Sequence, residues 1–142
     1  MTDINFYVSK QEGWDNRLAI VFKLITMALK RKMAIHIHTS NENESKLLDE
    51  YLWKHQRTSF LPHSIISDES THSKIEISIG HNFEPMNHCD YLISLSSDRP
   101  EFFSRYLKFA EILDTSEEIL TAGRKRYAFY RDRGYTLEYH KL

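Results

Sequence analysis

Glycine, proline and cysteine are all scarce in this chain of 142 residues, which contains four glycines, three prolines and one cysteine. The single cysteine, Cys89, excludes an intrachain disulfide, and the sequence lacks the several Cys and His ligands of a structural zinc site. A chain with one free thiol suits the reducing cytoplasm, which is where we expect this protein to work. The composition predicts neither a metal nor another cofactor.

Neither sign of charge dominates the chain. Nineteen Lys and Arg stand against twenty Asp and Glu, which gives a formal net charge of -1. No global field would draw the molecule onto a phosphate backbone, so direct nucleic-acid binding would need a local basic patch. The sequence also lacks the roughly 20 consecutive apolar residues that span a bilayer, and its first residues do not form a signal peptide. We therefore expect neither export nor contact with a membrane.

Apolar residues recur along the chain with periods that alternate between those of a strand and a helix. Short apolar or alternating runs predict strands at residues 4–8, 33–38, 74–79, 90–95 and 109–113. Helices are predicted at about 18–30, from 41–43 to 53–54, and from a cap at Thr115 or Ser116 to Arg133, with a short helical segment at 101–106 and Gly134 as the stop. The alternation predicts one three-layer α/β domain over residues 1–142, with a mostly parallel sheet flanked by helices.

The glycines of a nucleotide-binding fold are missing from the first predicted strand-to-helix turn. Open α/β sheets commonly bind phosphates beyond the carboxyl ends of their strands. Here that turn reads Val8-Ser9-Lys10-Gln11-Glu12-Gly13, which matches neither the dinucleotide fingerprint nor the P-loop. A nucleotide-dependent enzyme that uses this crevice remains an alternative function.

Other residues that could act as catalysts or metal ligands lack the partner residues that such chemistry needs. His36 and His38 share one face of a predicted strand, but no acidic or thiol partner stands at a ligand-like spacing, which favours packed or solvated side chains. Cys89 lies between His88 and Asp90, and adjacency in sequence does not supply the geometry that activates a thiol. We therefore predict no catalytic residue and no metal site.

Large apolar side chains stand where the second predicted helix ends. Pro62 cannot donate a backbone hydrogen bond and biases Leu61 toward an extended conformation, so Phe60 and Leu61 are expected on an irregular segment. Such a segment holds either a core plug or an anchor for a partner protein. The run is Leu52-Trp53-Lys54-His55-Gln56-Arg57-Thr58-Ser59-Phe60-Leu61-Pro62-His63.

The last predicted helix has two faces when it is plotted at 100° per residue. The face expected to pack on the sheet holds Ile119, Ala122, Phe129, Tyr130 and the stem of Arg126. The opposite stripe holds Leu120, Arg124, Tyr127 and Arg131. This stripe is either a solvated basic face or a grip for an acidic peptide with an aromatic tip, with Leu113 of the preceding strand as a pocket wall. Direct nucleic-acid binding by residues 124–133 is a further alternative.

Three blocks of the sequence together resemble the chi subunit of bacterial DNA polymerase III. They are Phe6-Tyr7, the segment from Leu48 to His63, and Arg124-Lys125-Arg126-Tyr127-Ala128-Phe129-Tyr130-Arg131. The resemblance runs nearly end to end. It implies a Rossmann-like, mononucleotide-binding-like fold without the Gly-rich loop. It also implies a non-catalytic adaptor that works without a cofactor in the clamp loader of the polymerase holoenzyme during DNA replication.

The resemblance further implies two separate partner surfaces, with DNA contacted mainly through a partner. The psi subunit of the clamp loader is expected at Trp53, Phe60, Leu61 and Pro62, a surface that a repair helicase could use in competition. The acidic C-terminal tail of single-stranded-DNA-binding protein is expected at Leu113, Arg124, Tyr127 and Arg131. The family pattern has basic residues where this chain has Leu120 and Ala128, so either the pocket binds the tail more weakly or Lys125 or Lys108 assists Arg124.

Overall fold

The computed structural model describes residues 2–55, 63–65, 77–81 and 90–142, in which seven strands form one sheet. The order across the sheet is β3-β4-β2-β5-β6-β1-β7, and every neighbouring pair is parallel. The strands are β1 (Asp3–Val8), β2 (Ile35–His38), β3 (His63–Ile65), β4 (Ile77–Gly80), β5 (Tyr91–Ser94), β6 (Lys108–Leu113) and β7 (Leu137–Lys141). The helices are α1 (Trp14–Lys30), α2 (Glu42–His55), the 3-10 helix η1 (Phe103–Arg105) and α3 (Glu117–Asp132).

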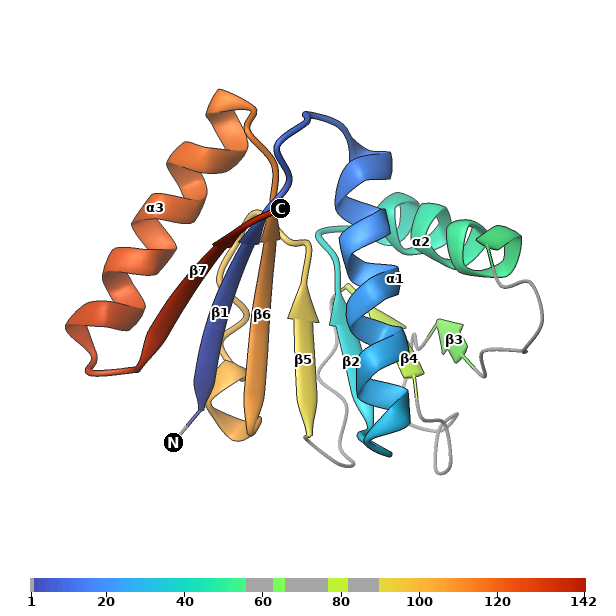
Figure 1. Ribbon diagram of the computed structural model, residues 1–142, viewed down its shortest axis with the longest axis horizontal. Helices are drawn as coiled ribbons and strands as arrows, with labels where there is room; N and C mark the ends of the chain where they lie inside the picture. The colour runs from blue at the N-terminus through green and yellow to red at the C-terminus, as the bar shows by residue number, and fades with distance from the viewer. Residues whose placement is uncertain (1, 56–62, 66–76, 82–89) are drawn as a thin grey trace.

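Helices cover both faces of the sheet, as the strand–helix alternation predicts, and Figure 1 shows α1 and α3 at different ends of it. Successive strand residues point to opposite faces, so the buried apolar residues divide into two clusters. One cluster packs beneath α1 and α2 and contains Ile37, Ile93 and Ile112 of the central strands. The other packs beneath α3 and η1 and contains Phe6, Phe109 and Tyr130. The predicted three-layer α/β architecture is therefore confirmed.

The structure adds two strands that the sequence patterns did not predict. β3 and β7 form the two edges of the sheet, and the sheet is entirely parallel in the described residues rather than mostly so. The second strand begins at Ile35 instead of Met33, because the Met33 N–H still donates to Ala28 O at the end of α1 (3.1 Å). The fourth strand is described from Ile77, while residues 74–76 of the predicted run lie outside the described residues.

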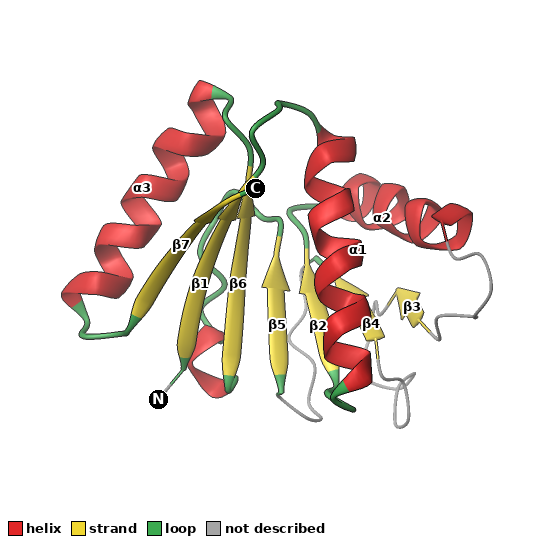
Figure 2. Cartoon of the chain, viewed as in Figure 1, coloured by secondary structure: helices red, strands yellow, loops and turns green. Residues whose placement is uncertain are grey.

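α3 begins and ends where the sequence predicts, but the predicted side-chain cap at its N-terminus does not form. Ser116 precedes the helix, but its hydroxyl donates to the carboxylate of Asp114 and does not cap a helical N–H. Gly134 follows the helix with φ 85°, in the left-handed region that glycine adopts readily, and its N–H donates to Arg131 O (3.0 Å). The chain then turns back into β7 beside β1 (Figure 2).

Candidate functional site

A pocket of about 330 Å³ opens between α3 and the β1–β7 end of the sheet. Four elements contribute to it, and α3 contributes most. All four residues that the sequence analysis assigned to an acidic tail, Leu113, Arg124, Tyr127 and Arg131, line this one pocket. The full lining is Phe6, Leu113, Leu120, Gly123, Arg124, Tyr127, Ala128, Arg131 and Tyr139.

The pocket lies where α3 approaches the end of β6 closely. Gly123 is buried in the middle of α3, and a Cβ added there would stand 2.5 Å from Cδ1 of Leu113. A larger residue at position 123 would force the Leu113 side chain to shift, so the two residues together shape this part of the pocket. Phe6 of β1 packs against Tyr127 with ring centroids 5.2 Å apart in an edge-to-face arrangement. The site is therefore a preformed apolar cleft rather than a loose surface patch.

Two guanidinium groups stand at the exposed rim of this apolar cleft. Arg124 is exposed and forms no ion pair within the described residues. Arg131 approaches Asp132 (Nε–Oδ1 3.3 Å), but both side chains are largely exposed, so solvent weakens that pair and Arg131 can exchange it for another anion. The cleft thus offers an apolar space beside groups that can bind a carboxylate through two parallel hydrogen bonds.

The sequence analysis was wrong about the direction of the Leu120–Arg131 stripe. Leu120 and Tyr127 do not point away from the sheet; they are half-buried against the cluster around Phe6. The helix faces the sheet with Gly123, Arg126 and Tyr130, so the stripe lies beside the sheet, facing β1 and β7.

The two cations expected to assist Arg124 do not line the pocket. Lys108 lies at the opposite end of β6 from Leu113, and its ammonium stands 5.4 Å from the ring centroid of Tyr91, which belongs to the cluster on the other face of the sheet. Lys125 is exposed on α3 outside the pocket lining. Leu120 and Ala128 do line the pocket and add apolar side chains to it.

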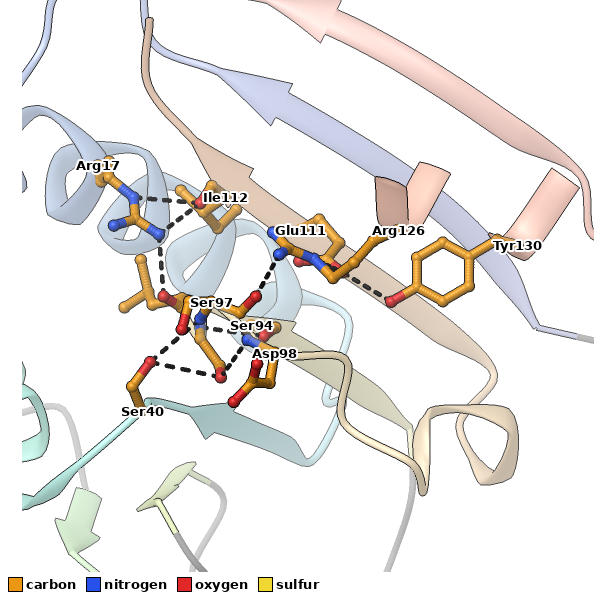
Figure 3. Close-up of polar contacts among 11 residues, drawn as sticks. Arg17, Ser40, Ser94, Ser97, Asp98, Glu111, Ile112, Arg126 and Tyr130 are labelled. Carbon is orange, nitrogen blue, oxygen red and sulfur yellow. Dashed lines mark hydrogen bonds and ion pairs between the residues drawn. The ribbon is translucent and has the colours of Figure 1, made fainter. Parts of the chain in front are cut away.

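A buried polar network fixes the inner face of α3 (Figure 3). Glu111 of β6 is fully buried and accepts hydrogen bonds from Arg126 Nε (2.9 Å) and Tyr130 Oη (2.7 Å) at one carboxyl oxygen, Oε2. Arg126 also donates to the carbonyl of Ser97 (2.6 Å). Burial raises the pKa of Glu111, and the opposing effects of Arg126 and Tyr130 do not cancel it. These contacts hold the helix in one rotation, with the Arg124 and Tyr127 side chains at the pocket.

At the carboxyl end of β6, the chain itself supplies an anion to the N-terminus of α1. The N–H of Gly13, at the N-terminus of α1, donates to the Asp114 carboxylate (2.9 Å) at the place where a phosphate would bind. Burial by itself raises the pKa of the Asp114 carboxyl, but hydrogen bonds from Ser116 and Gly13 lower it by more, so the pKa lies below its usual value. Arg17 is buried and donates to the carbonyls of Ile112 and Leu95 (2.8 and 2.9 Å; Figure 3).

His36 and His38 pack on the sheet face beneath Phe102, as the packed alternative predicts. The His36 and His38 rings are 6.5 Å apart, and Nδ1 of His36 contacts Ser78 Oγ (2.7 Å). Burial lowers the pKa of His36 to about 3 and that of His38 to about 4, and neighbouring imidazoles add to both effects. Within the described ranges, no three His, Cys, Asp or Glu side chains gather closely enough to hold a metal ion. His88 and Cys89 lie outside those ranges.

The second predicted surface is described only in part. Trp53 lies on α2 with 45% of its surface exposed, and Leu47, six residues earlier on the same helix, is 40% exposed. Phe60, Leu61 and Pro62 lie outside the described residues. No helix in the described portion is both long and apolar enough to cross a bilayer.

Sequence reasoning missed Phe6, Gly123 and Tyr139 as pocket residues. Phe6 was assigned to a strand, but nothing local indicated that this strand would lie under the last helix. A signal for Tyr139 was present, since Leu137 and Tyr139 alternate with Glu138 and His140 as in a strand with one covered face.

Comparison with known proteins finds one family whose model matches nearly the whole chain. The model of the family described as DNA polymerase III chi subunit, HolC, matches residues 1–138. The DNA polymerase III subunit chi of Pseudomonas aeruginosa (strain PAO1) is 31% identical over 142 residues, covering 100% of this chain and 98% of that protein. The subunit chi of Haemophilus influenzae (strain Rd) is 26% identical over 103 residues, covering 71% of this chain and 70% of that protein.

Proposed function

Because this chain belongs to the DNA polymerase III chi subunit family, we propose that it is a non-catalytic subunit that bridges two partners during DNA replication. One partner is the psi subunit of the clamp loader, bound at Trp53, Phe60, Leu61 and Pro62. The other is the acidic C-terminal tail of single-stranded-DNA-binding protein, bound in the pocket beside α3.

The observation that carries the tail site is the composition of that pocket. An acidic peptide with an aromatic side chain needs an apolar cavity for the ring and cations at the edge for its carboxylates. Phe6, Leu113 and Tyr127 provide the cavity, while Arg124 and Arg131 provide the cations. Because the network around Glu111 holds α3 in place, the peptide would meet a preorganised site and lose less binding energy to ordering.

The exposed part of α2 supports the second surface. Trp53 exposes a large apolar area on this helix, and aromatic side chains of this kind are common at the centre of protein interfaces. This helix covers the β2–β4 end of the sheet, whereas the pocket lies at the β1–β7 end. Two partners could therefore bind at the same time without steric conflict.

Binding both partners at once would tether the clamp loader to DNA. A clamp loader that holds this subunit would be tethered to DNA coated by single-stranded-DNA-binding protein, which raises its local concentration at primer ends. The arrangement needs no reaction at the bridging subunit and no direct DNA contact by it.

Replacing Arg124 by alanine is expected to weaken binding of the tail peptide by about 1.5–3 kcal/mol, the usual value of a hydrogen bond between charged groups. The measurement is isothermal titration calorimetry with an Asp-rich peptide that ends in Phe. Binding should also weaken as salt is raised, since the guanidinium is exposed. Lys125→Ala is the matched control, because Lys125 is exposed on the same helix but does not line the pocket. If both variants lost the same binding free energy, Arg124 would not be a specific contact of the peptide.

Replacing Phe60 by alanine is expected to weaken binding of the psi subunit by about 2 kcal/mol or more, as for other buried aromatic anchors. Surface plasmon resonance with immobilised psi measures the loss, and tail binding by the same variant should be unchanged. Leu107→Ala, which removes an apolar side chain that is 64% exposed outside both surfaces, is the control. An unchanged psi affinity in Phe60→Ala would show that the psi surface lies elsewhere.

A further inference from the structure

The edge of the sheet beside the tail pocket is open. β7 is the last strand in the order and pairs only with β1 in the part of the chain that the structure describes. Its side chains are half-buried or exposed, and Tyr139 exposes 54% of its surface although it lines the pocket. A free strand edge can pair with the backbone of an extended peptide.

The hydrogen bonds to β1 determine which backbone groups of β7 face outward. Ile4 N–H donates to Thr136 O (3.3 Å), and Leu142 N–H donates to Val8 O (2.8 Å). In a parallel pair, bonding residues alternate along each strand, so the even-numbered residues of β7 point their N–H and C=O groups toward β1. The backbone groups of Leu137, Tyr139 and Lys141 therefore point toward the open edge.

The same three residues direct their side chains to the face that α3 covers. Tyr139 is in register with Phe6, whose ring lies in the pocket, and strand side chains at matching positions share a face. In a strand added beside β7, the residue opposite Tyr139 would place its Cβ about 5 Å from that of Tyr139, on the same face. Its side chain would consequently point at the pocket.

Charge at this edge favours an acidic strand. Arg131 and Arg124 stand on α3 beside β7, and Lys141 points to the same face of the sheet as Tyr139. Glu138 points to the opposite face, where it lies 3.6 Å from His140, away from the α3 side. An acidic peptide would thus meet three cations on the face that its anchor residue enters.

We propose that the acidic tail bound in the α3 pocket extends along β7 as an added strand, with the backbone of Tyr139 bonded to the main chain of the peptide. This inference rests on the proposed tail-binding function, and it assigns part of the recognition to main-chain groups of β7. It explains why a site on α3 lies at a strand edge rather than over the middle of the sheet.

Amide hydrogen exchange of the intact protein tests the added strand. We expect the Tyr139 and Lys141 amides to exchange at least tenfold more slowly with the Asp-rich, Phe-ended peptide bound. The Glu138 and His140 amides already face β1 and are expected to change little. N-methylation of the peptide amide that pairs with Tyr139 should weaken binding at least tenfold, or about 1.4 kcal/mol, whereas N-methylation of the next amide should not.

The outcomes separate this inference from the function on which it rests. If the peptide shifts the NMR signals of Leu113 and Tyr127 but leaves the exchange of Tyr139 and Lys141 unchanged, the tail site stands and the added strand is wrong. If every N-methylated peptide binds as tightly as the parent, the added strand is equally excluded. If no peptide binds at all, both the tail site and the added strand are overturned.

Discussion

Replacing Glu111 by alanine is expected to lower the free energy of unfolding by about 3–5 kcal/mol, the range for breaking a buried ion pair by removing one partner. The loss is large because Arg126 is itself buried and would retain only the carbonyl of Ser97 as a partner. Tyr130 would also lose its acceptor in a fully buried position. Urea denaturation followed by circular dichroism measures the change.

The double variant Glu111→Leu/Arg126→Met shows how much of this loss comes from leaving Arg126 buried without its partner. The remainder is the net contribution of the ion pair to stability. Replacing both partners by apolar side chains should restore most of the stability, because no buried charge is left unpaired. Glu138→Ala, which removes an exposed carboxylate from β7, serves as the control and should change stability little. A loss below about 1 kcal/mol in Glu111→Ala would contradict the buried pair as a stabilising contact.

Acidification from about pH 6.5 to about pH 4.5 is expected to lower the free energy of unfolding by about 4 kcal/mol through His36 and His38. Burial lowers the folded-state pKa of His36 to about 3 and of His38 to about 4, whereas each imidazole has a pKa of 6.5 when unperturbed. Between these values the unfolded chain binds more protons than the folded one. The stability is therefore present above pH 6.5 and is lost as the pH falls toward the folded-state pKa values.

Urea denaturation at a series of pH values, with wild type and His36→Asn/His38→Asn compared, measures this contribution. The double variant is expected to lose less stability over the same interval, since its unfolding would no longer free the two low-pKa imidazoles to take up protons. His140→Asn, which replaces a half-buried imidazole on β7, is the control and should follow wild type. Parallel curves for wild type and the double variant would exclude the two histidines as the cause.

Local sequence patterns were sufficient to predict which residues of α3 share the pocket. Leu120, Arg124, Tyr127 and Arg131 are spaced by four, three and four residues, so their common stripe follows from helical geometry alone. The face that this stripe meets depends on the sheet, and there the sequence analysis was wrong. Gly123 and Arg126 decide the rotation of α3, one by allowing close approach to Leu113 and the other by pairing with Glu111.

The remaining pocket residues depend on contacts between distant parts of the chain. Phe6 and Tyr139 lie in register only because a parallel crossover through α3 returns β7 to the side of β1. Glu111 occupies a core-facing position between Phe109 and Leu113, and no local pattern identifies the partner that makes its burial tolerable. Periodicity predicts elements and faces, whereas pairing across the sheet needs the assembled fold.

The bond between Gly13 N–H and Asp114 makes the N-terminus of α1 a site with a permanently attached anion. Because the Asp114 carboxylate is part of the same chain, its effective concentration at this site is high, and free anions compete with it poorly. The N-terminus of α1 is therefore expected to keep this carboxylate whatever the concentration of free phosphate compounds. Such constancy would suit the bridging function that we propose, because neither partner surface would then depend on a bound nucleotide.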